Sequence, residues 1–393
     1  MKIAYFSCYR DGTGYSHAGI NNILAMKKTG LNVVARPINL TPLKNTGINF
    51  DIIEAEKNTL DNIDIVIQHA LPHMFEYKGG VKNIGYFDWE TTNFNRSTWT
   101  QSLNLMDEIW VPSIQNKYAC IHSKIKKRIR IIPHSCDINK YNKTIEPLNI
   151  PQFKDKCIFY FIGEMTRRKN LSGLIRSYYS AFSGKDNVGL IIKTNIPGKS
   201  SEEAKEYIKG FIEEIKNNIH IYSNHHNYPP ILIITDYLSE DKLDQIHKLG
   251  NIFVSISHGE GGCLPAFDAM GFGNPVIASN WGFFPELLYE QADEYFNLLT
   301  QEFKDTGEID CGWLVPGQLT HCFGMKGGIQ EIYTGTEQWF DPNLLELSKI
   351  MRNSYYEWQT GLLNKKGIAA KNRIIKFSHE NIGHLIKEAL EDK

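Results

Sequence analysis

Short apolar runs alternate with longer amphipathic segments along this chain, which is the pattern of parallel βαβ units. The apolar runs that predict strands form two series, Ile3–Ser7, Asn32–Arg36, Ile63–Gln68, Asn83–Phe87, Glu108–Pro112 and Ile129–Pro133, then Cys157–Gly163, Val188–Thr194, Ile231–Thr235, Ile252–Ser255 and Pro275–Ala278. Helical periodicity is clearest at Asn170–Phe182, Ser201–Asn217 and Ser239–Leu249. The pattern predicts an α/β protein with two Rossmann-like, doubly wound domains that face each other across a ligand cleft.

The two series of strands are separated by a polar, proline-bearing segment at Asn139–Pro151. We therefore predict one Rossmann-like domain over residues 1–150 and a second Rossmann-like domain over residues 151–340. Two amphipathic segments, Pro342–Thr360 and His379–Leu390, predict C-terminal helices within residues 341–393 that pack across both lobes. A chain of 393 residues is long enough for two domains of about 100–200 residues each.

Composition indicates a soluble enzyme without identifying it. The formal net charge is −1, so the strongly basic balance of a nucleic-acid-binding protein is absent. Seven cysteines occur without a CxxC pair, and we expect neither a disulfide framework nor a zinc site. Met1 leads almost directly into the first apolar run, and no uninterrupted apolar stretch of about 18 residues occurs. The expected location is the cytoplasm.

The most informative segment follows the strand predicted at Ile252–Ser255. It places Glu260 before two adjacent glycines, Gly261 and Gly262, and then a proline that opens a short helix. Glycines allow backbone amides to approach an anion, and the start of a helix adds partial positive charge, so the loop through Cys263 and Leu264 predicts a phosphate cradle. Asp268 lies about one turn into the helix, where its carboxylate could accept hydrogen bonds from ligand hydroxyls.

Glu260 and Asp268 are separated by seven residues with a Leu-Pro between them, and Gly-Asn-Pro-Val-Ile-Ala-Ser follows at 273–279. This arrangement resembles the donor-site signature of the retaining nucleotide-sugar glycosyltransferases of family 4, which have the GT-B fold. The resemblance implies that Glu260 contacts the transferred sugar and that Asp268 holds the ribose hydroxyls. The family usually has glutamate at the second position, so the shorter aspartate weakens the ribose assignment.

A basic segment after the strand predicted at Cys157–Gly163 supports the same interpretation. The family carries Gly-Arg at this strand end and a lysine six residues after the glycine. Gly163 and Lys169 match, whereas Glu164 replaces the arginine, and Arg168 or Arg167 could substitute for it. Guanidinium and ammonium groups here would stabilise the charge on a departing nucleoside diphosphate. A solvated basic turn is the alternative.

The first predicted strand is followed by a glycine-rich loop at residues 11–19, where the resembling enzymes have theirs. Gly14 is its candidate donor-binding residue. Because dinucleotide-binding proteins place GxGxxG at the same point, the loop alone is a weak signal. His17 stands at the third glycine position and the second strand ends in Arg36, so an NAD enzyme is disfavoured.

Polar and aromatic residues also follow other strands of the first half. His69 ends a predicted strand, and the resemblance implies that it faces the transferred sugar; it is preferred to His73, and a purely structural histidine is the alternative. Asp88 and Glu90 are the candidate acceptor-binding residues. The neighbouring tryptophans could be core residues, and for Trp110 we prefer that interpretation.

Three further features concern the donor base and the surface. Tyr237 and Leu238 lie where the family contacts the nucleotide base, before a helix that Ser239 is expected to cap. Lys193 ends a strand and could point into the same cleft. The basic run at residues 124–130 could make peripheral contact with a membrane, although a solvated turn is the preferred interpretation.

These observations predict a metal-independent retaining glycosyltransferase. It would move a hexosyl group from a UDP-sugar or GDP-sugar to a hydroxyl of a glycan, lipid-linked, protein or nucleobase acceptor. Glu260, His69, Lys169 and Arg168 are the candidate catalytic residues, with no cofactor besides the co-substrate and no metal. The alternatives are an epimerase or phosphorylase of similar architecture, an NAD oxidoreductase and a non-catalytic sugar-nucleotide-binding subunit. No pattern indicates the oligomeric state.

Overall fold

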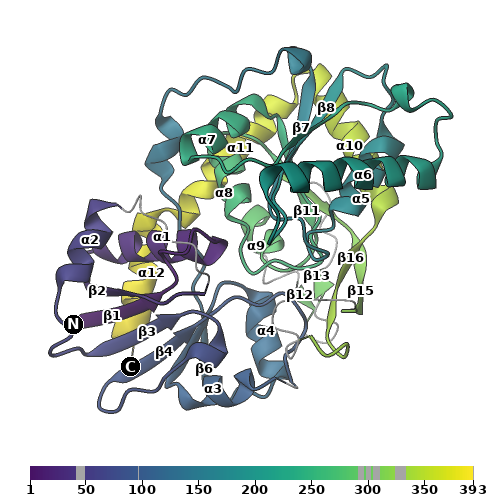
Figure 1. Cartoon of the computed structure of the whole chain (residues 1–393). Helices are drawn as coiled ribbons and strands as arrows, with labels where there is room; N and C mark the ends of the chain where they lie inside the picture. The colour runs from purple at the N-terminus through teal and green to yellow at the C-terminus, as the bar shows by residue number, and fades with distance from the viewer. Residues whose placement is uncertain are drawn as a thin grey trace.

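The computed structural model describes residues 1–40, 49–95, 97–290, 296–297, 302–303, 310–323 and 333–392. Over these residues the chain forms two lobes, each built around a six-stranded parallel sheet with helices against it (Figure 1). The predicted α/β class with two doubly wound domains is confirmed. The predicted domain boundaries stay predictions.

The first sheet has the strand order β2-β1-β3-β4-β5-β6, and all neighbouring strands are parallel. Its elements are β1 (Lys2–Ser7), α1 (Gly14–Lys28), β2 (Asn32–Pro37), α2 (Phe50–Lys57), β3 (Ile65–His69), β4 (Lys82–Tyr86), α3 (Trp99–Leu105), β5 (Glu108–Val111), α4 (Ile114–His122) and β6 (Arg128–Ile131). Ser7, His69 and Tyr86 lie in register, so the carboxyl ends of β1, β3 and β4 share one edge. Parallel α/β sheets bind ligands at this edge.

The second sheet has the strand order β14-β11-β10-β7-β8-β9 and is also parallel. Its elements are β7 (Cys157–Ile162), α5 (Leu171–Ala181), β8 (Val188–Lys193), α6 (Ser201–Ile219), β9 (Ile231–Ile234), α7 (Glu240–Leu249), β10 (Ile252–Ser255), α8 (Leu264–Gly271), β11 (Val276–Ser279), α9 (Phe284–Leu288) and β14 (Gly312–Val315). Central strands β7 and β10 are buried almost throughout, which explains their continuous apolar sequences. The chain reverses direction across the sheet between β7 and β10, and the loops after these two strands therefore flank a crevice.

Several elements after residue 310 were not predicted. They are the edge strand β14, the antiparallel hairpin of β15 (Gly317–His321) and β16 (Gln338–Pro342), and helix α11 (Leu363–Ile374). Strand β14 has only four residues and β15 is largely exposed, so neither contains the long apolar run on which the other strand predictions depend. The short strands β12 (Phe296–Asn297) and β13 (Glu302–Phe303), which lie before residue 310, pair with each other.

The C-terminal helices connect the two lobes. Helix α10 (Leu344–Gln359) lies against α5, where the Ser348 hydroxyl donates to the backbone oxygen of Ser177 at 3.2 Å. Helix α12 (His379–Glu391) returns to the first domain and packs on α1. A Cβ atom on Gly383 would lie 2.3 Å from the backbone oxygen of Ala25, so glycine permits this close approach. Figure 1 shows the yellow C-terminal segment running from the second lobe to the first.

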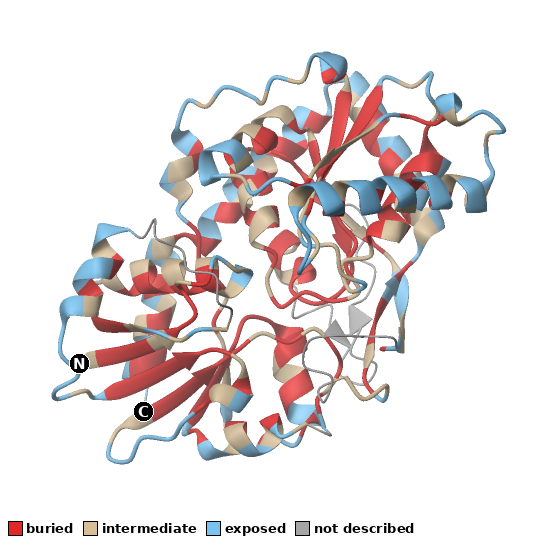
Figure 2. Ribbon diagram, in the orientation of Figure 1, coloured by how far each residue is buried: buried red, intermediate tan, exposed pale blue. Residues whose placement is uncertain are grey.

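Buried residues concentrate along the strands of both sheets, whereas the outer faces of helices such as α6 are exposed (Figure 2). Among the described helices, none is both long enough and apolar enough to cross a membrane. The loops at the facing edges of the two sheets are also largely buried, and they form the region described next.

Candidate active site between the two domains

A buried carboxylate, Glu260, lies in the loop between β10 and α8 and is 3% exposed. Its Oε1 atom is 2.5 Å from Lys169 Nζ and accepts a hydrogen bond from Ser257 Oγ at 2.5 Å. Its Oε2 atom is 3.3 Å from Arg168 Nη1. Burial raises the pKa of Glu260, but the positive charges of Lys169 and Arg168 outweigh burial and hold the pKa below its usual value. The structure thus brings together three of the four predicted catalytic residues.

Arg168 connects this cluster to the first domain. Its Nη1 atom donates to the backbone oxygen of Gly259 at 2.6 Å, and its Nε atom is 3.5 Å from Glu90 Oε1. The hydroxyl of Tyr333 also donates to Glu90. Burial lowers the pKa of Arg168, but the negative charges of Glu260 and Glu90 raise it by more. The pKa is therefore above its usual value, and the guanidinium stays charged. One arginine therefore binds acidic groups from both domains.

The glycines of the predicted phosphate cradle lie directly against the first domain. A Cβ atom on Gly261 would lie 2.5 Å from Asp88 Cβ, and one on Gly262 would lie 2.4 Å from His134 Cδ2. A Cβ on Gly259 would lie 2.3 Å from the backbone oxygen of Glu90. These glycines are therefore needed for the contact between the domains in this conformation, whatever their role toward an anion. The binding of a diphosphate by this loop, including Cys263 and Leu264 at the start of α8, stays a prediction.

Two histidines and an aspartate face one another on the first-domain side. Single ligand atoms of His69, Asp88 and His134 all lie within 4.8 Å of one another. His134 Nε2 is 2.8 Å from Asp88 Oδ1, and His69 Nδ1 is 2.7 Å from the hydroxyl of Tyr5. His69 Nε2 is buried and makes no hydrogen bond. Two imidazoles and a carboxylate can bind a sugar hydroxyl or a transition-metal ion.

Burial lowers the pKa of His69 to about 3. Between pH 7 and pH 5 the unfolded chain takes up a proton on this imidazole that the folded chain does not, so the free energy of unfolding falls as the pH falls. We expect His69 to account for a loss on the order of 1–2 kcal/mol over this range. Urea unfolding of the wild-type protein and His69→Gln at both pH values measures it. His122→Gln, at an exposed histidine, should leave the pH dependence unchanged, and an equal dependence in His69→Gln would contradict the assignment.

The second acid of the predicted signature, Asp268, contacts residues that connect the domains. Its Oδ1 atom is 2.9 Å from Lys140 Nζ and 2.9 Å from the hydroxyl of Tyr141, both in a 3-10 helix at Ile138–Asn142. Burial raises the pKa of Asp268, but the positive charge of Lys140 lowers it by more than burial raises it. The carboxylate is therefore ionised. Its side chain is 28% exposed and thus remains partly accessible. The ribose assignment stays a prediction.

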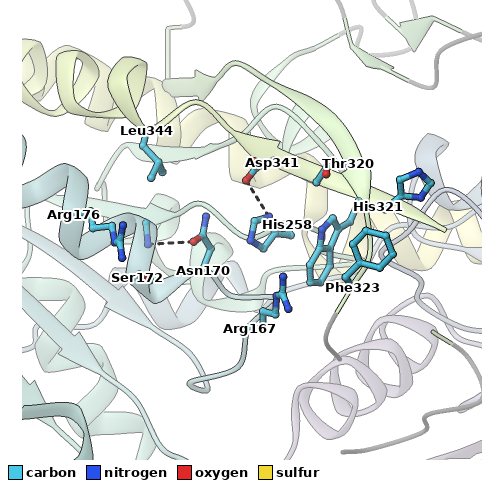
Figure 3. A pocket seen from close by; sticks show the side chains of 12 residues that line it. Arg167, Asn170, Ser172, Arg176, His258, Thr320, His321, Phe323, Asp341 and Leu344 are labelled. Carbon is cyan, nitrogen blue, oxygen red and sulfur yellow. Dashed lines mark hydrogen bonds and ion pairs between the residues drawn. The ribbon is translucent and has the colours of Figure 1, made fainter. Parts of the chain in front are cut away.

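The remaining predicted donor residues make no hydrogen bond or ion pair with Glu260 among the described interactions. Arg167 lines a pocket in which its guanidinium lies over the ring of Trp339, 5.9 Å from the ring centre (Figure 3), and its donor-binding role stays a prediction. Lys193 ends β8, and burial lowers its pKa. Tyr237 is 90% exposed, while Leu238 packs against the core.

Three smaller predictions have simple outcomes. Gly14 begins α1 at the loop after β1, and Gly163 follows β7, with no contact of either to Glu260 among the described interactions. Ser239 stands at the N-cap of α7, but its side chain makes no capping hydrogen bond, so the capping prediction is wrong in detail. Trp110 is 1% exposed, which confirms it as a core residue.

The sequence reasoning missed several residues of this site. Ser257 lies three positions before Glu260 and could have been suspected from that spacing. Lys140, Tyr141 and the side chain of His134 reach the site only through the fold, because their partners are between 46 and 128 positions away. No local motif indicates that Lys140 or Tyr141 belongs to the site.

Two Rossmann-like domains that meet at the carboxyl ends of their strands define the GT-B class of protein. Residues 143–296 match the family model described as glycosyl transferases group 1, which covers less than half of the chain. The matched segment contains Lys169, Glu260 and Asp268. A comparison with curated proteins gives no match.

Solved structures similar to this chain share the fold over its whole length. Sucrose-phosphate synthase from Thermosynechococcus elongatus is 15% identical, with a TM-score of 0.62 over 100% of this chain and 98% of that chain. HepE from Anabaena, solved with UDP and glucose, is 12% identical, with a TM-score of 0.59 over 100% of both chains. Trehalose-6-phosphate synthase OtsA is 10% identical, with a TM-score of 0.65 over 100% and 99%. These likenesses confirm the GT-B fold, and the family-model match supports glycosyltransferase activity in general terms.

Proposed function

We propose that the protein is a retaining glycosyltransferase that moves a hexosyl group from a nucleoside-diphosphate sugar to an acceptor hydroxyl. The observation that carries the proposal is the buried cluster of Glu260, Lys169 and Arg168 at the domain interface, within the segment that matches the glycosyltransferase model. The cluster combines a carboxylate with two fixed positive charges in a site with little solvent. Such charges act strongly on a reacting diphosphate.

In the proposed reaction, the bond between the anomeric carbon and the phosphate oxygen breaks, and the acceptor oxygen forms a bond to the same face of that carbon. The acceptor proton passes to the departing phosphate oxygen, so the sugar keeps its anomeric configuration. Lys169 and Arg168 stabilise the charge that develops on the diphosphate. Glu260 contacts the transferred sugar and holds these two cations in place.

The first domain supplies the acceptor side. His69 Nε2, which is buried without a partner, is available to a sugar hydroxyl, and Asp88 and Glu90 are the acceptor-binding acids. Burial raises the pKa of Asp88, but the hydrogen bond and charge of His134 outweigh burial, so the pKa stays below its usual value. An ionised carboxylate accepts a hydrogen bond from an acceptor hydroxyl and orients it.

The donor is a UDP-sugar or a GDP-sugar. HepE was solved with UDP, and another structural neighbour, from E. coli, with UDP-2-fluoroglucose, which favours uridine. The acceptor class stays open among a glycan, a lipid-linked sugar, a protein and a nucleobase. Peripheral membrane contact by residues 124–130 and a cytoplasmic location also stay predictions; Arg128 and Arg130 of this run form ion pairs with Asp392.

We also propose that transfer needs no cofactor and no metal ion, because Lys169 and Arg168 already supply two positive charges beside Glu260. Activity should therefore survive EDTA treatment. If EDTA abolishes activity and a divalent ion restores it, the proposal of metal-independent transfer is overturned. If the divalent ion restores activity in the wild-type protein but not in His134→Gln, the metal belongs to the cluster of His69, Asp88 and His134.

Thermal unfolding with a panel of UDP-, GDP- and ADP-sugars and NAD tests the proposed function. A ligand at about 100 times its Kd stabilises the folded state by about 2.7 kcal/mol, which is readily measured. We expect one sugar nucleotide to stabilise the wild-type protein and Lys185→Ala, a charge control in an exposed turn, but not Lys169→Ala. The anomeric coupling constant of the transferred sugar, measured by NMR, then tests retention. Stabilisation by NAD and by no sugar nucleotide would refute the proposed transferase function. A product of inverted configuration would refute the retaining mechanism.

A further inference from the structure

A pocket lies next to the loop that carries Arg168 and Lys169. It has a volume of about 340 Å³ and is formed by the start of α5, the loop after β10 and the hairpin of β15 and β16 (Figure 3). Arg168 and Lys169 contact Glu260, whereas the adjacent Arg167 lines this pocket. The pocket is therefore distinct from the candidate active site, although a single loop contributes to both.

The pocket contains two arginines without acidic partners. Arg167 lies over Trp339, and Arg176 extends from the exposed face of α5. Among the described residues neither forms an ion pair, whereas Arg168 and Arg352 each bind a carboxylate. Two unpaired guanidinium groups that line one pocket repel each other, and an oxyanion bound between them would remove that repulsion. The N-terminus of α5 adds further positive potential.

Aromatic rings form another part of the same pocket. Trp339 stacks on His258 with ring centres 4.6 Å apart, and His321 stacks on Phe323 with ring centres 5.4 Å apart. Phe323 is 57% exposed, so its ring is accessible to a ligand in the pocket. Aromatic rings next to hydrogen-bonding groups suit the alternating apolar and hydroxyl surfaces of a sugar ring.

Polar groups of the wall complete the chemistry. Asn170 lies at the N-cap of α5, and Thr320 and Ser172 offer hydroxyls to the pocket. Asp341 is the acidic group among the lining residues, and its Oδ1 atom is 3.8 Å from His258 Nδ1. Two arginines against one carboxylate leave the pocket positive, so it favours anionic over cationic ligands.

We propose that this pocket is a second binding site, for a sugar that carries a phosphate or carboxylate group. Arg167 and Arg176 bind the oxyanion, and Phe323 with its stacked neighbour His321 covers the sugar ring. The site goes beyond the proposed transfer reaction and does not depend on it, because binding here needs neither Glu260 nor a nucleotide. A charged sugar unit of a larger glycan and a free sugar phosphate share this chemistry.

Titration calorimetry of the full chain tests the site with glucose 6-phosphate, glucuronate, glucose and inorganic phosphate. We expect one of the two anionic sugars to bind, about tenfold more weakly to Arg167→Ala and Arg176→Ala, with unchanged affinity for Lys185→Ala. Lys169→Ala should keep the affinity, which places the ligand outside the catalytic cluster. Phe323→Ala, which alters an exposed ring, should weaken binding of the sugar but not of inorganic phosphate. A preference for the phosphate or the carboxylate probe tells which group the site takes.

Three results would overturn the proposal. They are no binding of either anionic sugar, equal binding of glucose or inorganic phosphate, and affinities unchanged in both arginine variants. Circular dichroism and melting temperature of each variant show that it is folded, so a loss of affinity cannot come from unfolding. Since no nucleotide or acceptor is present, failure of the transfer assay would leave this result intact, and failure here would leave the transfer proposal intact.

Discussion

Replacing Lys169 with methionine is expected to lower the free energy of unfolding by about 3–5 kcal/mol at pH 7. Methionine keeps much of the length and apolar stem of lysine but removes the charge that lies 2.5 Å from Glu260. Because Glu260 is 3% exposed, its carboxylate would stay buried with Arg168 as its remaining charged partner, at 3.3 Å. Urea unfolding of the wild-type protein and the variant measures the difference. The low end of the range is expected because Arg168 still compensates part of the charge.

A matched control isolates burial as the cause. Lys209 and Glu206 form an ion pair of the same length, 2.5 Å, with both side chains more than half exposed. Lys209→Met should therefore cost less than about 1 kcal/mol. The double variant Lys169→Met with Glu260→Gln should be more stable than Lys169→Met alone, because no charge is left unpaired. If Lys169→Met and Lys209→Met lower the free energy of unfolding equally, the buried ion pair does not stabilise the protein more than the exposed one.

The same variant should respond to acid in a defined direction. In the wild-type protein the pKa of Glu260 is lowered, so the stabilisation of its ionised form is present above the unfolded pKa and is lost as the pH falls through the folded pKa. In Lys169→Met the pKa rises, and protonation relieves the buried charge. The gap in stability between the two proteins should therefore narrow from pH 7 to pH 4. A gap that widens on acidification would contradict the assignment.

The central strands and the loop chemistry could be predicted because each is local in sequence. The apolar runs of β7 and β10 are continuous since both faces of these strands are covered. Glu260 could be found because glycines and a helix-starting proline surround it. Glu260 and Lys169 are 91 positions apart in the sequence. Their contact could still be expected, because they lie in the loops after the neighbouring parallel strands β10 and β7, and these loops meet at one edge of the sheet.

Contacts between the domains could not be predicted in this way. Nothing near Lys140 or Tyr141 indicates that both reach Asp268, because that contact depends on how the 3-10 helix after β6 lies against α8. The sequence explains Gly261 and Gly262 as part of a phosphate-binding loop. The structure shows that they also leave room for Asp88 and His134 of the first domain. Arg167 and Arg168 are adjacent and chemically identical, and only the course of the loop sends one to Trp339 and the other to Glu260.

Glu260→Gln is expected to reduce the rate of sugar transfer by about 10²–10³-fold. The amide has nearly the same shape as the carboxylate and its oxygen can still accept a hydrogen bond from Lys169, but without the charge it accepts hydrogen bonds from the transferred sugar more weakly. The effect should appear in kcat for the preferred sugar nucleotide, measured from UDP or GDP release at saturating donor and acceptor. Glu206→Gln, which removes an equivalent charge from an exposed pair, should leave kcat unchanged.

Nucleotide binding separates this role from a loss of folding. UDP lacks the sugar that Glu260 is proposed to contact, so its Kd should differ by less than about threefold between the wild-type protein and Glu260→Gln, while the UDP-sugar binds more weakly. Lys169→Met should instead weaken both ligands, because its target is the diphosphate that they share. If Glu260→Gln weakens UDP as much as the UDP-sugar, the carboxylate acts mainly by organising the site. If transfer continues at the wild-type rate, Glu260 is not a catalytic residue, and the buried cluster serves to hold the two domains together.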